Sequence, residues 1–284
     1  MVELWLLYAL GVALLMGVSS LINRSILKRA DPLAYALAFQ IFSALFFIPL
    51  FTFEFAIPSN IEAWILAIAA SILWAAIAVI GFQSYKFAEV SLKTPVGRSK
   101  ILFSMLFAAI VLGEVLSPNK LLGGILVFFG VVLAAFKFGK PLGGFEDIGV
   151  KLTLLSALMT GAVAVIDKMA ISYFQPSVYG FLQYALPTVW LWIAIPKRQD
   201  RLKKLMKTDG KWIILVSLFG MVWYWLLLKA YQVGGEVSVI TPTLELSILI
   251  SVFGGILLLK EKTDLIKRII GSILTIIGAI VLRL

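Results

Sequence analysis

Apolar residues fill this chain in long runs, and short polar segments separate each run from the next. An α-helix needs about 20 predominantly apolar residues to cross the hydrocarbon core of a bilayer. The pattern therefore predicts an all-α membrane protein with ten transmembrane helices. They are expected over residues 4–22, 33–52, 62–85, 91–112, 119–137, 148–167, 177–195, 212–231, 238–259 and 267–283.

The composition agrees with this class and narrows the chemistry. Of the 284 residues, 61% are hydrophobic and 14% are charged, whereas soluble proteins are about 45–50% apolar and about 25% charged. We therefore expect no sizeable soluble domain. The chain has no Cys and no His, which excludes disulfides, thiol catalysis, Cys or His metal sites and a His proton relay. We expect neither an enzyme nor a cofactor.

One stretch of the sequence occurs twice. Residues 89–95 read Glu-Val-Ser-Leu-Lys-Thr-Pro, and residues 236–242 read Glu-Val-Ser-Val-Ile-Thr-Pro. In each copy a Glu follows the Pro by 19 residues, and these residues are Glu114 and Glu261. The constant offset of 147 residues indicates an internal repeat.

The repeat extends over the whole chain. Two further sets of residues match: Gly17, Asn23, Pro32 and Tyr35 with Gly161, Asp167, Pro176 and Tyr179 at an offset of 144, and Gly123 and Gly130 with Gly271 and Gly278 at an offset of 148. The matches divide the chain into repeats at 1–138 and 148–284, with a joint at 139–147. Five helices per repeat is an odd number, so the second repeat enters the membrane from the opposite side. This predicts an inverted repeat, which is typical of secondary transporters.

The positive charges lie unevenly on the two predicted faces. One set of loops holds 19 Lys and Arg residues, and the face that carries both termini holds 4. The positive-inside rule makes the first face cytoplasmic, so we expect a multi-pass plasma-membrane protein with extracytoplasmic termini. The net charge of +10 is thereby assigned to topology, and nucleic acid is not expected as a partner.

Arg98 and Lys100 are charged residues well inside one predicted helix, and Glu245 lies well inside another. Such residues are functional candidates, because charge in a bilayer is costly. Arg98 and Glu245 occupy the same position of the two repeats, so we expect them to flank the midplane with room for a zwitterion between them. Arg binds carboxylate or phosphate well, and Glu245 could hold an ammonium group or a proton. The alternatives are that Arg98 and Glu245 pair directly, or that the two cations reach toward the positive face.

Several aromatic and polar residues lie within predicted helices and could line a cavity. Trp74, Gln83, Trp223, Tyr224, Ser20 and Asn23 complete the candidate substrate-binding set with the three charged residues. Packing would also explain the aromatic residues. Hydrogen bonds between helices would explain the polar ones, and Asp167 as well. The matched glycines predict close helix packing, either within one chain or in a homodimer.

The chain resembles the drug/metabolite transporter superfamily of the EamA type. Gly113-Glu114 and Lys260-Glu261 close two matched helices, and each pair precedes a short polar turn and a glycine-bearing helix. The resemblance implies a central cavity and the export of amino acids or other metabolites. Family members often carry a mid-helix Pro about a dozen residues before the Glu, whereas Pro95 and Pro242 come earlier here. Ten-helix members also usually have cytoplasmic termini, which the charge count opposes.

These observations predict a secondary transporter, an exporter of a small organic metabolite such as an amino acid, working by alternating access. Proton coupling is left open, as is the choice between monomer and homodimer. The alternative is a flippase for a lipid-linked headgroup, or a carrier of the nucleotide-sugar type, because Arg98 and Lys100 would suit phosphate equally well.

Overall fold

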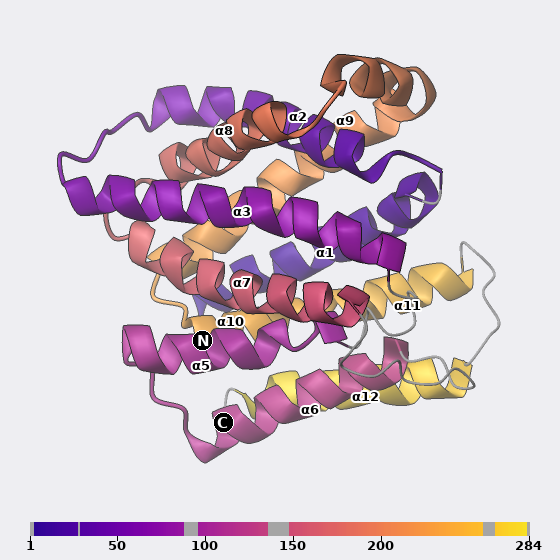
Figure 1. The fold of residues 1–284 in the computed structure, drawn as a ribbon. Coiled ribbons are helices and arrows are strands. Elements are labelled where there is room, and N and C mark those ends of the chain that lie inside the picture. The colour runs from indigo at the N-terminus through magenta and orange to yellow at the C-terminus, as the bar shows by residue number, and fades with distance from the viewer. Residues whose placement is uncertain (1–2, 28, 88–95, 136–147, 258–264, 283–284) are drawn as a thin grey trace. The chain divides into compact units, whose positions relative to one another are not determined.

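The computed structural model describes residues 3–27, 29–87, 96–135, 148–257 and 265–282. These ranges contain eleven helices and no strand, so the all-α prediction is confirmed for them (Figure 1). The helices are α1 (Leu4–Leu27), α2 (Pro32–Phe53), α3 (Ile61–Phe87), α5 (Lys100–Leu112), α6 (Pro118–Ala135), α7 (Ile148–Ala170), α8 (Pro176–Ala194), α9 (Arg198–Gln232), α10 (Val237–Leu244), α11 (Ser247–Leu257) and α12 (Leu265–Val281).

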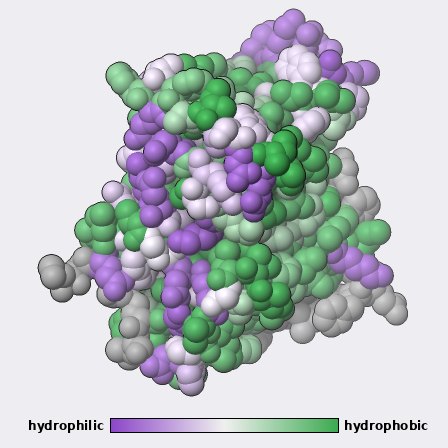
Figure 2. Space-filling view, turned by 90° about the vertical axis from the view of Figure 1, so that its left-hand side faces the viewer, coloured by the Kyte–Doolittle hydropathy of each residue, from purple (hydrophilic) through white to green (hydrophobic). Residues whose placement is uncertain are grey.

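Length and composition allow five of these helices to cross a membrane: α1, α2, α3, α7 and α9. Shorter apolar helices make up much of the remaining described chain. Many large apolar side chains lie on the outside, for example Leu14 on α1, Ile65 on α3 and Ile110 on α5. Figure 2 shows hydrophobic residues over much of the face that it draws. Surface of this kind suits lipid and would promote aggregation in water.

The helices follow the predicted spans in order, with two differences. The predicted helix over 238–259 is divided into α10 and α11. The segment 197–211 was expected to be a loop, but α9 runs unbroken through most of it for 35 residues. That expectation was wrong because Lys, Arg, Leu and Met, which are frequent in this segment, have high helix propensity. A cluster of positive charges is therefore compatible with a helix as well as with a loop. The predicted joint at 139–147 and the Lys260-Glu261 pair lie outside the described residues.

The contacts divide the chain into two compact units. Unit 1 comprises Met1–Val79 and Ile166–Gly234, and unit 2 comprises Ile80–Val165 and Gly235–Leu284. Each unit therefore draws helices from both predicted repeats. The repeat boundaries themselves remain a prediction, because a unit defined by contacts is not the same thing as a repeat defined by sequence.

Unit 1 is built around α2, α8 and α9. Helix α2 packs on α8 and α9, and α1 also packs on α9 (Figure 1). Glycine makes two of these contacts close: a Cβ atom on Gly180 would lie 2.5 Å from the ring of Phe47, and one on Gly220 would lie 2.4 Å from the ring of Phe39. The core of the unit accordingly includes two rings that lie directly against glycines.

Unit 2 contains a close helix crossing, between α6 and α12, which lie side by side in Figure 1. A Cβ atom on Gly123 would lie 2.8 Å from the carbonyl oxygen of Gly278, and one on Gly130 would lie 2.7 Å from that of Gly271. The four matched glycines thus contact one another in an antiparallel arrangement. The prediction of close packing is confirmed, and the contact is formed within one chain.

We predict that Gly130→Ala destabilises the protein. The added Cβ atom would lie 2.6 Å from the backbone nitrogen of Thr275, and a backbone atom of an opposing helix cannot move aside as a flexible side chain can. Overpacking of this kind typically costs about 1–3 kcal/mol. The free energy of unfolding, or the melting temperature in detergent, should fall accordingly.

Gly97→Ala is the matched control for this prediction. Its Cβ atom would meet only the methyl group of Thr153, at an ordinary contact distance of 3.6 Å. The two alanine variants differ in the space around the new methyl group. Equal melting temperatures would therefore show that close packing between α6 and α12 does not determine the stability of the protein.

Candidate functional site

Two helices of unit 2 are interrupted at matched positions of the sequence repeat. The helical turn before α5 breaks at Arg98 and Ser99, and α10 is separated from α11 by Glu245 and Leu246. Backbone hydrogen bonds between residues three positions apart span both breaks. They run from the Ile101 nitrogen to the Arg98 carbonyl at 3.0 Å and from the Ile248 nitrogen to the Glu245 carbonyl at 2.9 Å. Each break thus carries one charged residue of the matched pair.

Proline contributes to the second break. Pro242 lies inside α10, which ends two residues later at Leu244. Proline has no backbone N–H, and its ring clashes with the carbonyl group one turn earlier. The sequence predicted a continuous helix over 238–259, with Pro242 near its start. Because α10 begins at Val237, Pro242 is instead its sixth residue.

Arg98, Lys100 and Glu245 form one group, here called the charged triad. Lys100 Nζ lies 2.9 Å from Glu245 Oε1, and Arg98 Nη1 contacts Oε2. Glu245 is only 1% exposed, whereas the side chains of Arg98 and Lys100 are 26% and 23% exposed. The expectation that Arg98 and Glu245 stand apart was wrong, and the alternative of direct pairing is what the structure has. The two cations hold Glu245 from both of its oxygens.

The charged triad carries an excess of positive charge. Two cations contact one carboxylate, so the formal charge of the group is +1. In a low-dielectric environment an uncompensated charge is costly, and a further anion nearby would lower that cost. The cations are also its more accessible members. The arrangement is therefore suited to receive an anionic group.

Unit 1 contains a second polar group, centred on Asp167 near the end of α7. The hydroxyl of Tyr179 on α8 donates to Oδ1 at 2.8 Å, and the hydroxyl of Tyr224 on α9 donates to Oδ2 at 3.0 Å. Asp167 is 1% exposed. The sequence analysis expected it to bond between helices, which is confirmed, but did not select it as a site residue.

Three predicted site residues lie together beside this carboxylate. The ring of Tyr224 makes edge-to-face contacts with Trp74 at 6.3 Å and Trp223 at 5.7 Å between ring centroids. Tyr184 contacts the same ring at 5.5 Å. The Nε1 atom of Trp74 is buried, and no described residue accepts its hydrogen. Tyr224 therefore joins the carboxylate to a cluster of aromatic rings.

The first repeat contains a neutral version of the same hydrogen bond. Tyr35 donates to Asn23 Oδ1 at 2.5 Å, and these two residues match Tyr179 and Asp167 at an offset of 144. Both pairs are 12 residues apart. Asn23 thus holds α1 to α2, and any contact with substrate remains a prediction. An acid where the other repeat has an amide was the signal in the sequence that could have identified Asp167.

For the two remaining candidate residues, the structure gives no contact that indicates substrate binding. Ser20 donates to the carbonyl of Gly17 within its own helix at 2.8 Å. The side chain of Gln83 lies outside the part of the chain that the structure describes. In that same part, no group of three or more Asp and Glu residues could hold a metal ion.

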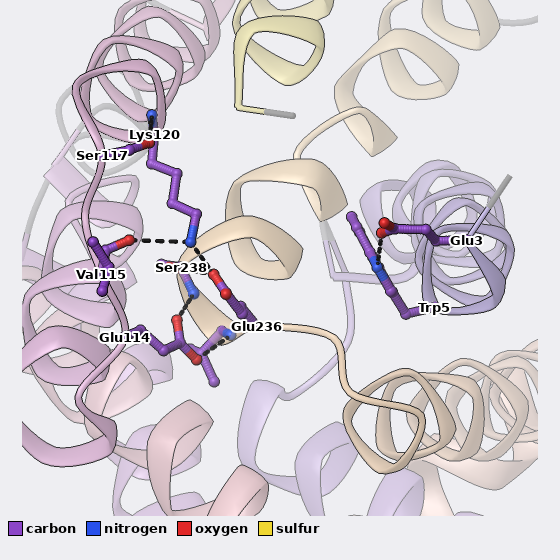
Figure 3. A network of polar contacts seen from close by, with 9 residues as sticks. Glu3, Trp5, Glu114, Val115, Ser117, Lys120, Glu236 and Ser238 are labelled. Carbon is purple, nitrogen blue, oxygen red and sulfur yellow. Dashed lines mark hydrogen bonds and ion pairs between the residues drawn. The ribbon is translucent and has the colours of Figure 1, made fainter. Parts of the chain in front are cut away.

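A third network surrounds the first turn of α10 (Figure 3). Glu114 accepts hydrogen bonds from the backbone nitrogens of Val237 at 2.8 Å and Ser238 at 2.9 Å. Lys120 pairs with Glu236, the residue that precedes the helix. A carboxylate at a helix N-terminus satisfies N–H groups that lack partners and interacts favourably with the helix dipole. The closing Glu of the first repeat therefore caps a helix of the second.

Comparison with known proteins agrees with the repeat and the fold. A model of the EamA-like transporter family matches the chain twice, over residues 3–136 and 147–284. An uncharacterized transporter of Archaeoglobus fulgidus is 25% identical over 247 residues, which cover 86% of this chain and 84% of that protein. A solved crystal structure shares the fold with a TM-score of 0.73 at 18% identity, covering 98% of this chain and 95% of that one.

We predict that Glu114→Ala destabilises α10. The substitution leaves the nitrogens of Val237 and Ser238 without the carboxylate that accepts from them. Loss of a helix N-cap typically costs about 0.5–2 kcal/mol. Amide hydrogen exchange at the start of α10 should accelerate, and the melting temperature in detergent should fall.

Glu62→Ala serves as the control for this effect. Glu62 also accepts a hydrogen bond, from the Tyr173 hydroxyl at 2.8 Å, but it lies exposed on the surface. Its removal should leave exchange in α10 unchanged. If Glu114→Ala and Glu62→Ala gave the same exchange rates at Val237 and Ser238, the capping role would be refuted.

Proposed function

Because the chain belongs to the EamA-like transporter family, it is a multi-pass membrane transporter rather than an enzyme, and we propose that it carries a small organic metabolite with an anionic group, such as an amino acid, by alternating access. The charged triad is the observation that carries this proposal. Its two half-buried cations around one buried carboxylate provide an excess positive charge within apolar helices.

Charge balance supports an anionic substrate. With Glu245 alone, the triad has two cations and one anion. A substrate carboxylate that contacts Arg98 or Lys100 would give each cation an anion of its own. The guanidinium group binds carboxylate through two parallel hydrogen bonds, which gives Arg98 the greater part in orienting the substrate.

The helix breaks favour a conformational change at the charged triad. Interrupted helices at membrane depth are tolerated where they line a cavity or are buried in protein, and transporters commonly bind substrate beside them. Here the breaks lie at Arg98 and Glu245 themselves. A change in the ion pairs of the triad would therefore act directly on the junctions at which α5 and α10 can bend.

The direction and setting of transport are part of the proposal. The excess of Lys and Arg on one predicted face supports a cytoplasmic location for that face, and the plasma membrane is the setting that we propose. The resemblance to metabolite exporters supports outward transport. Coupling to a proton gradient would supply the driving force, since the chain has no nucleotide-binding motif.

We predict that Arg98→Ala reduces uptake of labelled amino acids into proteoliposomes. Loss of a hydrogen-bonded contact to a charged group costs about 1.5–3 kcal/mol, so uptake at subsaturating solute should fall about ten- to hundredfold. A mixture of amino acids would be tested with and without a pH gradient. Lys207→Ala, which removes an exposed cation of α9, should transport like the parent protein.

A charge exchange separates binding from folding. The triple variant Arg98→Glu, Lys100→Glu and Glu245→Arg reverses all three charges of the triad, so that both contacts to position 245 remain ion pairs. If the ion pairs serve only stability, this variant should fold and transport normally. If Arg98 binds the substrate, the variant should melt near the parent temperature and remain defective in transport.

The uptake assay with the parent protein also distinguishes between the classes of substrate. No flux of any amino acid in the parent protein would overturn the lead substrate. Transfer of a fluorescent lipid-linked phosphate between leaflets, or exchange of a nucleotide-sugar, would then point to the phosphate-bearing alternatives. Arg98→Ala should impair those activities as well, because the same cations would bind phosphate.

A further inference from the structure

Asp167 differs from Glu245 in its surroundings. Both carboxylates are 1% exposed, but Glu245 contacts two cations, whereas no Lys or Arg in the described part of the chain forms an ion pair with Asp167. A buried carboxylate without a cationic partner is costly in its charged form. The charge of Glu245 is compensated by its two cationic partners, whereas that of Asp167 has no such compensation among the described residues.

The groups that face Asp167 come from three helices. Tyr179 on α8 and Tyr224 on α9 donate to its two oxygens. The next hydroxyl, that of Tyr184, donates to the carbonyl of Gly220 at 3.0 Å. On its own helix, the ammonium group of Lys168 donates to the carbonyl of Tyr231 at 2.7 Å. Tyrosines, which are neutral at physiological pH, therefore make the immediate contacts of the carboxylate.

The first repeat shows that this framework does not need an acid. Asn23 accepts the hydroxyl of Tyr35 just as Asp167 accepts that of Tyr179. A neutral amide oxygen thus suffices for the bond between the two helices. What Asp167 adds to the matched position is the ability to gain and lose a proton.

We propose that Asp167 is the residue that takes up the coupling proton, an inference that rests on the transport function proposed above. A proton fits the site better than a metal ion does. The two carboxylate oxygens already accept O–H donors, and a hard cation would require several further oxygen ligands. A proton requires only the one carboxylate.

Protonation would change the hydrogen bonds around the carboxyl group. When a proton binds Oδ2, that atom becomes an O–H donor and a weaker acceptor, so the hydrogen bond from the hydroxyl of Tyr224 weakens or that hydroxyl turns to accept from it. The ring of Tyr224 contacts Trp74, Trp223 and Tyr184. The change at one oxygen is thereby passed to the cluster of rings, which includes the buried Nε1–H group of Trp74.

The test is Asp167→Asn, which gives the second repeat the residue that the first already has. Counterflow of labelled amino acids without a pH gradient should persist in the variant. Accumulation driven by a gradient of one pH unit, which is about tenfold when one proton moves per solute molecule, should be lost. Gradients of both directions would be imposed. Persistent gradient-driven accumulation in Asp167→Asn would overturn the inference.

Glu62→Gln is the matched control. It also neutralises a carboxylate that accepts a tyrosine hydroxyl, but an exposed one. This variant should accumulate solute in response to the gradient as the parent protein does. If both variants lost that response equally, the effect would not belong to Asp167 and the inference would fail.

A measurement without any solute separates this inference from the transport proposal. In purified protein at neutral pH, exposed carboxyl groups are ionised. An infrared C=O band of a protonated carboxyl that grows in the parent as the pH is lowered and is absent from Asp167→Asn would support the assignment, even if no amino acid were transported. Identical spectra of the two proteins at every pH of the titration would overturn it. Melting temperatures would confirm that the variant folds.

Discussion

In a bilayer, water cannot satisfy backbone N–H and C=O groups, so these groups need partners within the protein. The structure is organised around the places where its helices are interrupted or begin. Two such places in unit 2 are accompanied by charge. Glu114 accepts from the first turn of α10, and the break after that helix holds Glu245 with Arg98 and Lys100. Irregular backbone at membrane depth requires such compensation. Two of these groups, Arg98 and Lys100, are also the cations that we propose to bind an anionic substrate, so stability and the proposed function share contacts.

The two repeats share their framework and differ in their charges. The bond between Tyr35 and Asn23 returns as the bond between Tyr179 and Asp167, and the position of Arg98 returns as Glu245. Spacing and hydrogen-bond geometry are kept, while amide becomes acid and cation becomes anion. Symmetry thus provides two equivalent positions, and the substitutions give the two positions different chemistry.

Much of this organisation could be predicted from the sequence, because a repeat and a period of apolar residues are one-dimensional signals. Close packing at Gly123 and Gly278 was expected from matched glycines seven residues apart, but the sequence left open whether it lies within one chain or in a homodimer. The pairing of Arg98 with Glu245 could be named only as one alternative, since spacing gives the depth of a residue along its helix but not the direction in which its side chain points. The length of α9 was missed because Lys and Arg favour both helix and loop. Asp167 was passed over because a polar residue in an apolar helix most often serves packing.

The seam between α6 and α12 also bears on how such a chain could arise. Gly123 meets Gly278 and Gly130 meets Gly271, so the surface is complementary to its own copy. A five-helix protein that inserted in both senses could have formed this seam between two identical molecules. Gene duplication and fusion would then have turned a contact between subunits into one within a chain. Only after that event could the two halves diverge, because in a homodimer every mutation appears twice.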